Sequence, residues 1–91
     1  MLLDRAILAR MALLFDEPVV VFEAPRSRRE LRDVESASRW LVEKWPKPKH
    51  RKHFKIAAGT CLAALEGRVT AAEARAAFAA AAEIEGLLLT Y

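Results

Sequence analysis

The segment 45–55 concentrates the side chains of this sequence that could bind an anion. It reads WPKPKHRKHFK and holds five lysines and arginines, two histidines and no acidic residue. Cations spaced along an extended segment can bind the phosphates of a nucleic acid or another polyanion, and Trp45 or Phe54 could stack on a base. The alternative is a solvated loop that leads into a helix, since loops often carry charge. The candidate anion-binding residues are Lys47, Lys49, Arg51, Lys52 and Lys55.

A second basic cluster consists of Arg26, Arg28 and Arg29. If it lay beside the segment 45–55, the joint patch would carry eight cations, five from one cluster and three from the other. The net charge is +3, of which 45–55 contributes +5, so the rest of the chain sums to −2. The basic character is therefore local, and it indicates electrostatic binding without base-specific recognition.

Metal and thiol chemistry are both disfavoured by the surroundings of the candidate residues. His50 and His53 are three residues apart and could share a helical face, but a metal site needs further ligands, and the neighbouring cations repel a metal ion. Cys61 lies between apolar neighbours in a helical pattern, which is typical of a small core residue and not of a nucleophile. We therefore expect no metal and no catalytic cysteine.

No phosphate-binding loop, dinucleotide fingerprint, nucleophile elbow or paired-cysteine spacing occurs in the sequence. A chain of 91 residues also has little room for a deep pocket. We expect a protein that is not an enzyme and that uses no cofactor and no small-molecule substrate.

Composition indicates one globular domain, with 54% apolar and 30% charged residues. The single cysteine excludes an internal disulfide framework. Charged residues interrupt the apolar N-terminal stretch, which therefore resembles neither a signal peptide nor a membrane span. We expect a soluble cytoplasmic protein that does not contact a membrane.

A β-hairpin is predicted first along the chain. Residues 18–23 (PVVVFE) form a strand whose consecutive apolar side chains predict burial of both faces. Residues 24–27 supply a turn, and residues 28–33 form a second strand with Leu31 pointing inward.

Three helices follow, over about 34–45, 51–66 and 71–85. Asp33 is the predicted N-cap of the first helix, at whose end Trp45 is expected to be partly exposed. For the second helix the predicted apolar stripe comprises Phe54, Ala57, Ala58, Cys61, Leu62 and Leu65. The third begins with a capping box, TAAE at 70–73.

This order predicts an α+β fold in which the N-terminal hairpin carries three helices on one sheet face. Residues 87–91 (LLLTY) are a possible short third strand. Residues 15–91 are expected to form the single domain. Residues 1–14 are either a short helix over the open sheet face or a disordered extension.

With these elements placed, the chain resembles the domain-of-unknown-function family 982, small alpha-proteobacterial proteins. The resemblance covers about residues 15–91 and rests on three stretches: FDEPVVV at 15–21, RELRDVESASRWLVEKWP at 29–46 and CLAALEGRVTAAEARAAFAAAAE at 61–83. The hairpin turn APRSRR lacks the glycine that members of the family often have there. The resemblance supports the fold and implies no catalytic residue, substrate or cofactor.

The sequence thus favours a small cytoplasmic protein of uncharacterised function, a non-catalytic protein-interaction or regulatory module. Its doubly apolar strand favours a protein partner or a homodimer. The alternative is binding of a nucleic acid or polyanion through residues 47–55.

Overall fold

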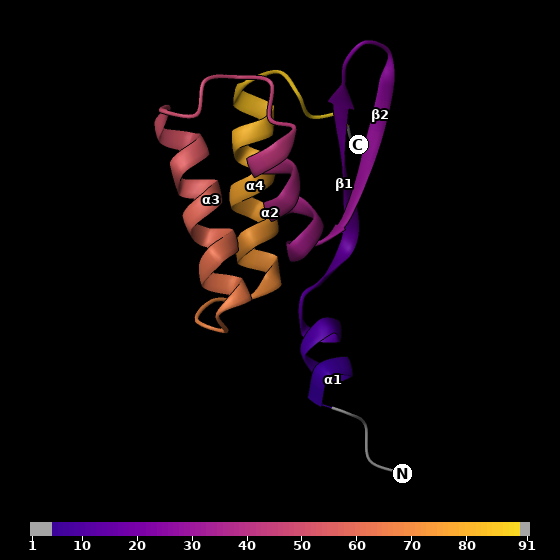
Figure 1. Ribbon diagram of the computed structural model, residues 1–91, viewed down its shortest axis with the longest axis vertical. Coiled ribbons are helices and arrows are strands. Elements are labelled where there is room, and N and C mark those ends of the chain that lie inside the picture. The colour runs from indigo at the N-terminus through magenta and orange to yellow at the C-terminus, as the bar shows by residue number, and fades with distance from the viewer. Residues whose placement is uncertain (1–4, 90–91) are drawn as a thin grey trace.

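The computed structural model describes residues 5–89, and Figure 1 shows a layer of helices beside a β-hairpin. The elements in chain order are α1 (Arg5–Ala12), β1 (Leu14–Glu23), β2 (Ser27–Asp33), α2 (Val34–Glu43), α3 (Lys52–Leu65) and α4 (Ala71–Ile84). A hairpin followed by three helices on one side of the sheet is the predicted α+β fold, which is confirmed. The strands are contacted by α2 and α4, and α3 packs against these two helices.

The hairpin is antiparallel and in the register that its inward side chains require. Val19 is opposite Leu31, and both are buried, as is Val21. β1 begins at Leu14, earlier than predicted, but its pairing with β2 shifts between Leu14 and Val19. Pro18 lies in this interval, and a proline has no N–H to give to a ladder.

Within the described part of this single chain, only one face of β1 is covered. Val20 is only half-buried and Phe22 is 38% exposed. The helices α2 and α4 cover one face, whereas α1 lies beyond the open end of the hairpin and leaves the other face bare (Figure 1). The short helix predicted within residues 1–14 therefore forms over Arg5–Ala12 but does not cover this face, and cover by a partner chain stays a prediction.

The chain returns to β1 after α4. The N–H of Phe22 donates to the carbonyl of Leu87 and the N–H of Leu89 donates to the carbonyl of Val20, both at 2.8 Å. Within the described residues this amounts to one antiparallel bridge, Val21 with Leu88, in place of the possible third strand. Positions 90 and 91 of that predicted strand lie outside the described residues.

Both predicted helix caps are present. The Asp33 carboxylate accepts from the N–H of Ser36 at 2.7 Å and starts α2. At the start of α4, the Thr70 hydroxyl accepts from the N–H of Glu73 at 3.1 Å, and the Glu73 carboxylate accepts from the N–H of Thr70 at 3.0 Å. These hydrogen bonds satisfy amides that a helix leaves unpaired at its N-terminus.

Trp45 is buried, contrary to the prediction that it would be partly exposed. It follows the end of α2 and is 5% exposed. Its ring packs edge-on against Trp40, with centroids 5.7 Å apart, and near Phe54 at 5.5 Å and Phe78 at 6.3 Å. The aromatic cluster holds the ends of α2 and α3 together, because such edge-to-face contacts add to the burial of large rings.

The buried stripe of α3 is also displaced from the predicted one. Ala57, Cys61 and Ala64 are buried, whereas Leu62 and Leu65 are exposed. The buried stripe consists of small residues because α3 packs closely against the alanine-rich α4. Size alone would have assigned the leucines to the core, but close helix approach selects the smaller side chains.

Candidate interaction surfaces

The basic segment forms the connection between α2 and α3 and the first turn of α3. Two of its five predicted cations have partners: Lys49 donates to the carbonyl of Val42 at 2.6 Å, and Arg51 pairs with Glu85 at 2.9 Å. Within the described part of the chain, Lys47, Lys52 and Lys55 have exposed side chains and no ion pair.

No side chain caps the N-terminus of α3 among the described residues, where Arg51 occupies the N-cap position. Exposed cations at this end of a helix oppose its dipole, so their presence does not stabilise α3 itself.

The second basic cluster lies around the tip of the hairpin. Arg29 pairs with Glu23 at 3.2 Å, and Arg26 and Arg28 are exposed. The hairpin tip and the connection between α2 and α3 lie at the same end of the molecule (Figure 1). The Arg51–Glu85 pair and the Phe22–Leu87 hydrogen bond link the basic segment through the end of α4 to β1. The structure therefore brings the two clusters to one end.

An aromatic ring for base stacking is less available than the sequence indicated. Trp45 is buried in the core, and its Nε1 has no hydrogen-bond partner in the described residues. Phe54 is partly buried against the same cluster. The exposed aromatic ring at this end is instead that of Phe22, which is 38% exposed and lies opposite Arg28 in the hairpin.

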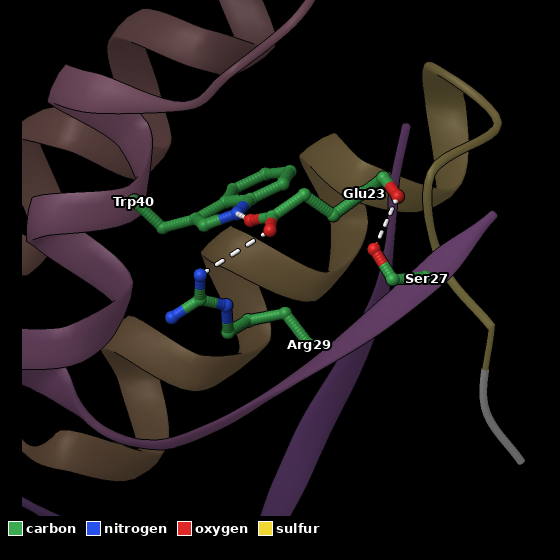
Figure 2. Close-up of polar contacts among 4 residues, drawn as sticks. All are labelled: Glu23, Ser27, Arg29 and Trp40. Atoms are coloured by element: carbon green, nitrogen blue, oxygen red, sulfur yellow. Dashed lines mark hydrogen bonds and ion pairs between the residues drawn. The ribbon is translucent and has the colours of Figure 1, made fainter. Parts of the chain in front are cut away.

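A polar contact that the sequence did not indicate joins the hairpin to α2 (Figure 2). The indole N–H of Trp40 donates to Glu23 Oε1 at 2.8 Å, and Arg29 donates to Glu23 Oε2 at 3.2 Å. These hydrogen bonds, the Trp40 bond foremost, lower the pKa of Glu23. A hollow of about 130 Å³ lies beside them, lined by Leu31 and residues of α2. The Trp40–Glu23 hydrogen bond thus links β1 of the hairpin to α2 of the helical layer.

Cys61 is a core residue, as predicted. Its side chain is fully buried, and burial raises the pKa of its thiol to about 11. The thiol is therefore protonated at neutral pH, which makes it a poor nucleophile. His50 and His53 are exposed, and the described residues contain no group of three or more histidines, cysteines, aspartates or glutamates that could hold a metal ion.

Helix α3 carries an exposed apolar surface that the sequence did not indicate. Ile56 is 46% exposed and Leu62 is 54% exposed, and both lie on the side away from the buried stripe. Gly59 is midway between them in the sequence, and a Cβ added there would meet no atom within 4 Å. We call Ile56, Gly59 and Leu62 the α3 outer face. Figure 1 shows α3 at the outer edge of the helical layer.

A glycine inside α3 has no explanation within the fold. A glycine in a helix interior costs about 1 kcal/mol relative to alanine. The two glycines that follow α3 and α4, Gly67 and Gly86, have φ of +79° and +75° and so end their helices in the left-handed region. Gly59 has neither this backbone requirement nor a crowding neighbour. The signal in the sequence was therefore a helical glycine flanked by apolar residues at three-residue spacing.

Within residues 5–89, none of the helices is both long enough and apolar enough to cross a bilayer.

The family described as "Protein of unknown function (DUF982)" matches residues 17–89 of the chain. The solution NMR structure of the Agrobacterium tumefaciens protein Atu1219 is similar to this structure, with a TM-score of 0.72 and 26% sequence identity. The similarity covers 88% of this chain and 79% of the Agrobacterium protein. No curated protein is significantly similar to the chain.

Proposed function

Because the chain belongs to the DUF982 family of proteins of unknown function, we propose its function from its own surfaces. It acts as a small, cytoplasmic, non-catalytic module that binds a protein through the α3 outer face. The buried, protonated Cys61 supports the non-catalytic part of this proposal, because it removes the sequence's one thiol from reach of a substrate.

The observation that carries the proposal is that α3 is apolar on more than one side. Its inner side packs Ala57, Cys61 and Ala64 into the core, and its outer side presents Ile56 and Leu62 to solvent. From Ile56 to Leu65 helix α3 carries no charged residue, and a helical segment that is apolar around its circumference belongs in an interior. Exposed apolar surface of this kind marks contact sites for other proteins. A partner on the α3 outer face would complete this burial.

Site-specific photo-crosslinking in living cells tests the proposal. A photoreactive amino acid replaces Leu62 on the α3 outer face, or Leu89 as a control. The exposed fraction of Leu89, 48%, is similar to the 54% of Leu62. Leu89, however, lies beside β1 and away from α3. We expect protein adducts from position 62 in clear excess over position 89. Failure to form any protein adduct at position 62 would contradict the proposal.

A second candidate function is polyanion binding at the basic end of the molecule. The observation that favours it is a set of exposed cations without ion pairs in the described residues: Lys47, Lys52, Lys55, Arg26 and Arg28. Their placement at one end lets a single extended anion reach both clusters.

Titration of labelled duplex and single-stranded oligonucleotides at several salt concentrations tests this candidate. Five phosphate contacts predict a slope of about −4.5 for the logarithm of the duplex binding constant against the logarithm of salt concentration. The triple change of Lys47, Lys52 and Lys55 to alanine should reduce the slope, and the change of Arg39 to alanine on α2 should not. Absence of binding at low salt would exclude this candidate.

A further inference from the structure

The pattern of side chains along the outer side of α3 is symmetric about Gly59. Ile56 precedes Gly59 by three residues, and Leu62 follows it by three. Lys52 precedes it by seven residues, and Glu66 follows it by seven, at the C-cap of α3. Steps of three, four and seven residues stay on one face of a helix, so these five residues form one stripe, and the exposed Lys55, four residues before Gly59, lies on it as well. Lys52 stands at one end of the stripe, and Glu66, whose Oε1 accepts from Arg68, stands at the other.

We propose that the protein forms a two-fold symmetric homodimer in which the α3 helices of two copies pack antiparallel and cross at Gly59. The inference rests on the proposed function and names the partner as a second copy of this chain. A two-fold axis at Gly59 brings Ile56 of each copy opposite Leu62 of the other. The same axis brings Lys52 of each copy opposite Glu66 of the other.

The charges favour this antiparallel arrangement over a parallel one. Antiparallel packing brings each Lys52 to the Oε2 atom of a Glu66, the carboxylate oxygen that Arg68 does not bind, whereas parallel packing would place Lys52 beside Lys52 and Glu66 beside Glu66. Lys52 also stands at the N-terminus of its own α3, the end where the helix dipole disfavours a cation. In the dimer it lies beside the C-terminal end of the other α3, where the dipole favours a cation. The arrangement thus accounts for a charge that the monomer leaves unexplained.

Gly59 allows the two helices to approach closely at their crossing. The absence of a side chain lets the two helix axes approach to about 8 Å, the lower limit of the 8–10 Å usual between packed helices. Closer approach brings Ile56 and Leu62 of both copies into mutual contact, and all four side chains leave water. The open space around Gly59 in the single chain is the space that the second copy fills.

The contact is small, because it involves one helix from each copy. Interfaces below about 1,200 Å² belong to transient associations, so we expect dissociation constants of micromolar order. Sedimentation of the full chain over about 1 μM to about 1 mM therefore spans the transition between monomer and dimer.

Two leucines of similar exposure provide the first variant and its control. Leu62→Lys places a cation in the centre of the apolar contact, and lysine is a good helix former, so the fold of α3 is retained. Leu89→Lys makes the same chemical change on an equally exposed residue beside β1. We expect Leu62→Lys to weaken dimerisation by at least tenfold and Leu89→Lys to leave it unchanged.

Charge reversal tests the antiparallel register. Lys52→Glu alone places glutamate opposite Glu66, and Glu66→Lys alone places lysine opposite Lys52. Each single change should weaken the dimer several-fold, since it turns two attractive pairs into two repulsive pairs. The double variant restores both pairs with their signs exchanged, and we expect it to recover most of the lost affinity. If the double variant instead loses as much dimer affinity as the two single changes combined, the antiparallel register is overturned.

The outcomes separate this inference from the proposed function. A wild-type chain that remains monomeric up to millimolar concentration overturns the homodimer. If position 62 then still crosslinks to a different protein, the interaction module stands with another partner. If position 62 gives no adduct and the chain stays monomeric, both proposals fail.

Discussion

Arg51 and Glu85 connect the start of α3 to the end of α4. The Glu85 side chain is only 6% exposed, whereas that of Arg51 is 52% exposed. The carboxylate of this ion pair is therefore nearly buried, and the guanidinium is half exposed to water. Glu85 is also the C-cap of α4, the end where a helix dipole disfavours an anion. Arg51 therefore does more than add positive charge to the basic segment, because it neutralises a carboxylate that lies away from water.

Removal of Arg51 should destabilise the fold more than removal of a neighbouring lysine. We expect Arg51→Ala to lower the free energy of unfolding by about 1–2 kcal/mol, because Glu85 loses its partner in a mostly buried place. Lys47→Ala should change it by less than about 0.5 kcal/mol, as is usual for an exposed side chain without a partner. Urea denaturation of the two variants measures the difference. Equal stabilities would show that the pair contributes nothing beyond surface charge.

The hydrogen bonds on Glu23 predict a pH dependence of stability. They lower the pKa of Glu23 in the folded chain below its value in the unfolded chain. The contribution is therefore fully present above the unfolded pKa and is lost as pH falls through the folded pKa. We expect wild type to be more stable than Glu23→Gln at neutral pH, with the difference shrinking as the pH falls below the ordinary pKa of a glutamate and the Glu23 carboxylate is protonated. Urea titrations followed by tryptophan fluorescence at several pH values measure this, and a pH-independent difference would contradict it.

Single residues were predicted best where local chemistry decides their environment. Asp33 and Thr70 cap their helices through hydrogen bonds within three residues, so the sequence contained all that was needed. The Glu23–Trp40 contact joins residues 17 apart, and Arg51–Glu85 joins residues 34 apart. Such pairs depend on how the hairpin and helices are packed, which no short sequence pattern contains.

Helix α3 has two sides with different roles. Its inner side follows small residues that let it approach α4, and its outer side carries larger apolar residues that nothing in the described chain covers. The prediction for α3 placed Leu62 in the core because a leucine in an apolar helix usually belongs there. Here the neighbouring helix α4 is rich in alanine, so the two backbones approach closely and only small side chains of α3 fit between them.

Gly59→Ala separates the stability of the folded chain from its association. We expect the variant to be more stable than wild type by about 0.8–1 kcal/mol at concentrations where the chain is monomeric, because the added methyl favours helix and meets no neighbour. The same methyl should weaken the dimer by separating the crossing helices. Thermal unfolding at low concentration and sedimentation at high concentration measure the two effects.

Gly67→Ala provides the contrasting change. Gly67 ends α3 with a φ of +79°, so a side chain there is strained, and we expect a loss of about 1 kcal/mol. If Gly59→Ala instead destabilised the monomer, then Gly59 would serve the fold, and its explanation as a contact point would fail.

Across the whole molecule, two surfaces face different directions with different chemistry. The α3 outer face is apolar and lies along the edge of the helical layer. The basic end joins the hairpin tip and the connection between α2 and α3. Lys52 lies between the two surfaces, since it begins α3 and is part of the basic segment. A dimer through α3 would therefore bring the basic segments of two copies into one assembly.

The sequence indicated the basic candidates but not their relation to each other. Their charge and exposure followed from composition and from the prolines of the connection, whereas the shared end of the molecule depends on the packing of β1, α4 and α3. The α3 outer face was overlooked for a related reason. An apolar residue on a helix looks the same in sequence whether it faces the core or a partner, and only the packed structure separates the two.

Cysteine crosslinking between two different variants tests the antiparallel α3 contact most directly. Ile56→Cys chains and Leu62→Cys chains are mixed in equal amounts and oxidised mildly, while the native Cys61 stays protected by its burial. We expect the mixture to form disulfide-linked dimers joining position 56 to position 62, well in excess of those formed by either variant alone. Equal crosslinking in the mixture and in the separate variants, or none at all, would contradict it.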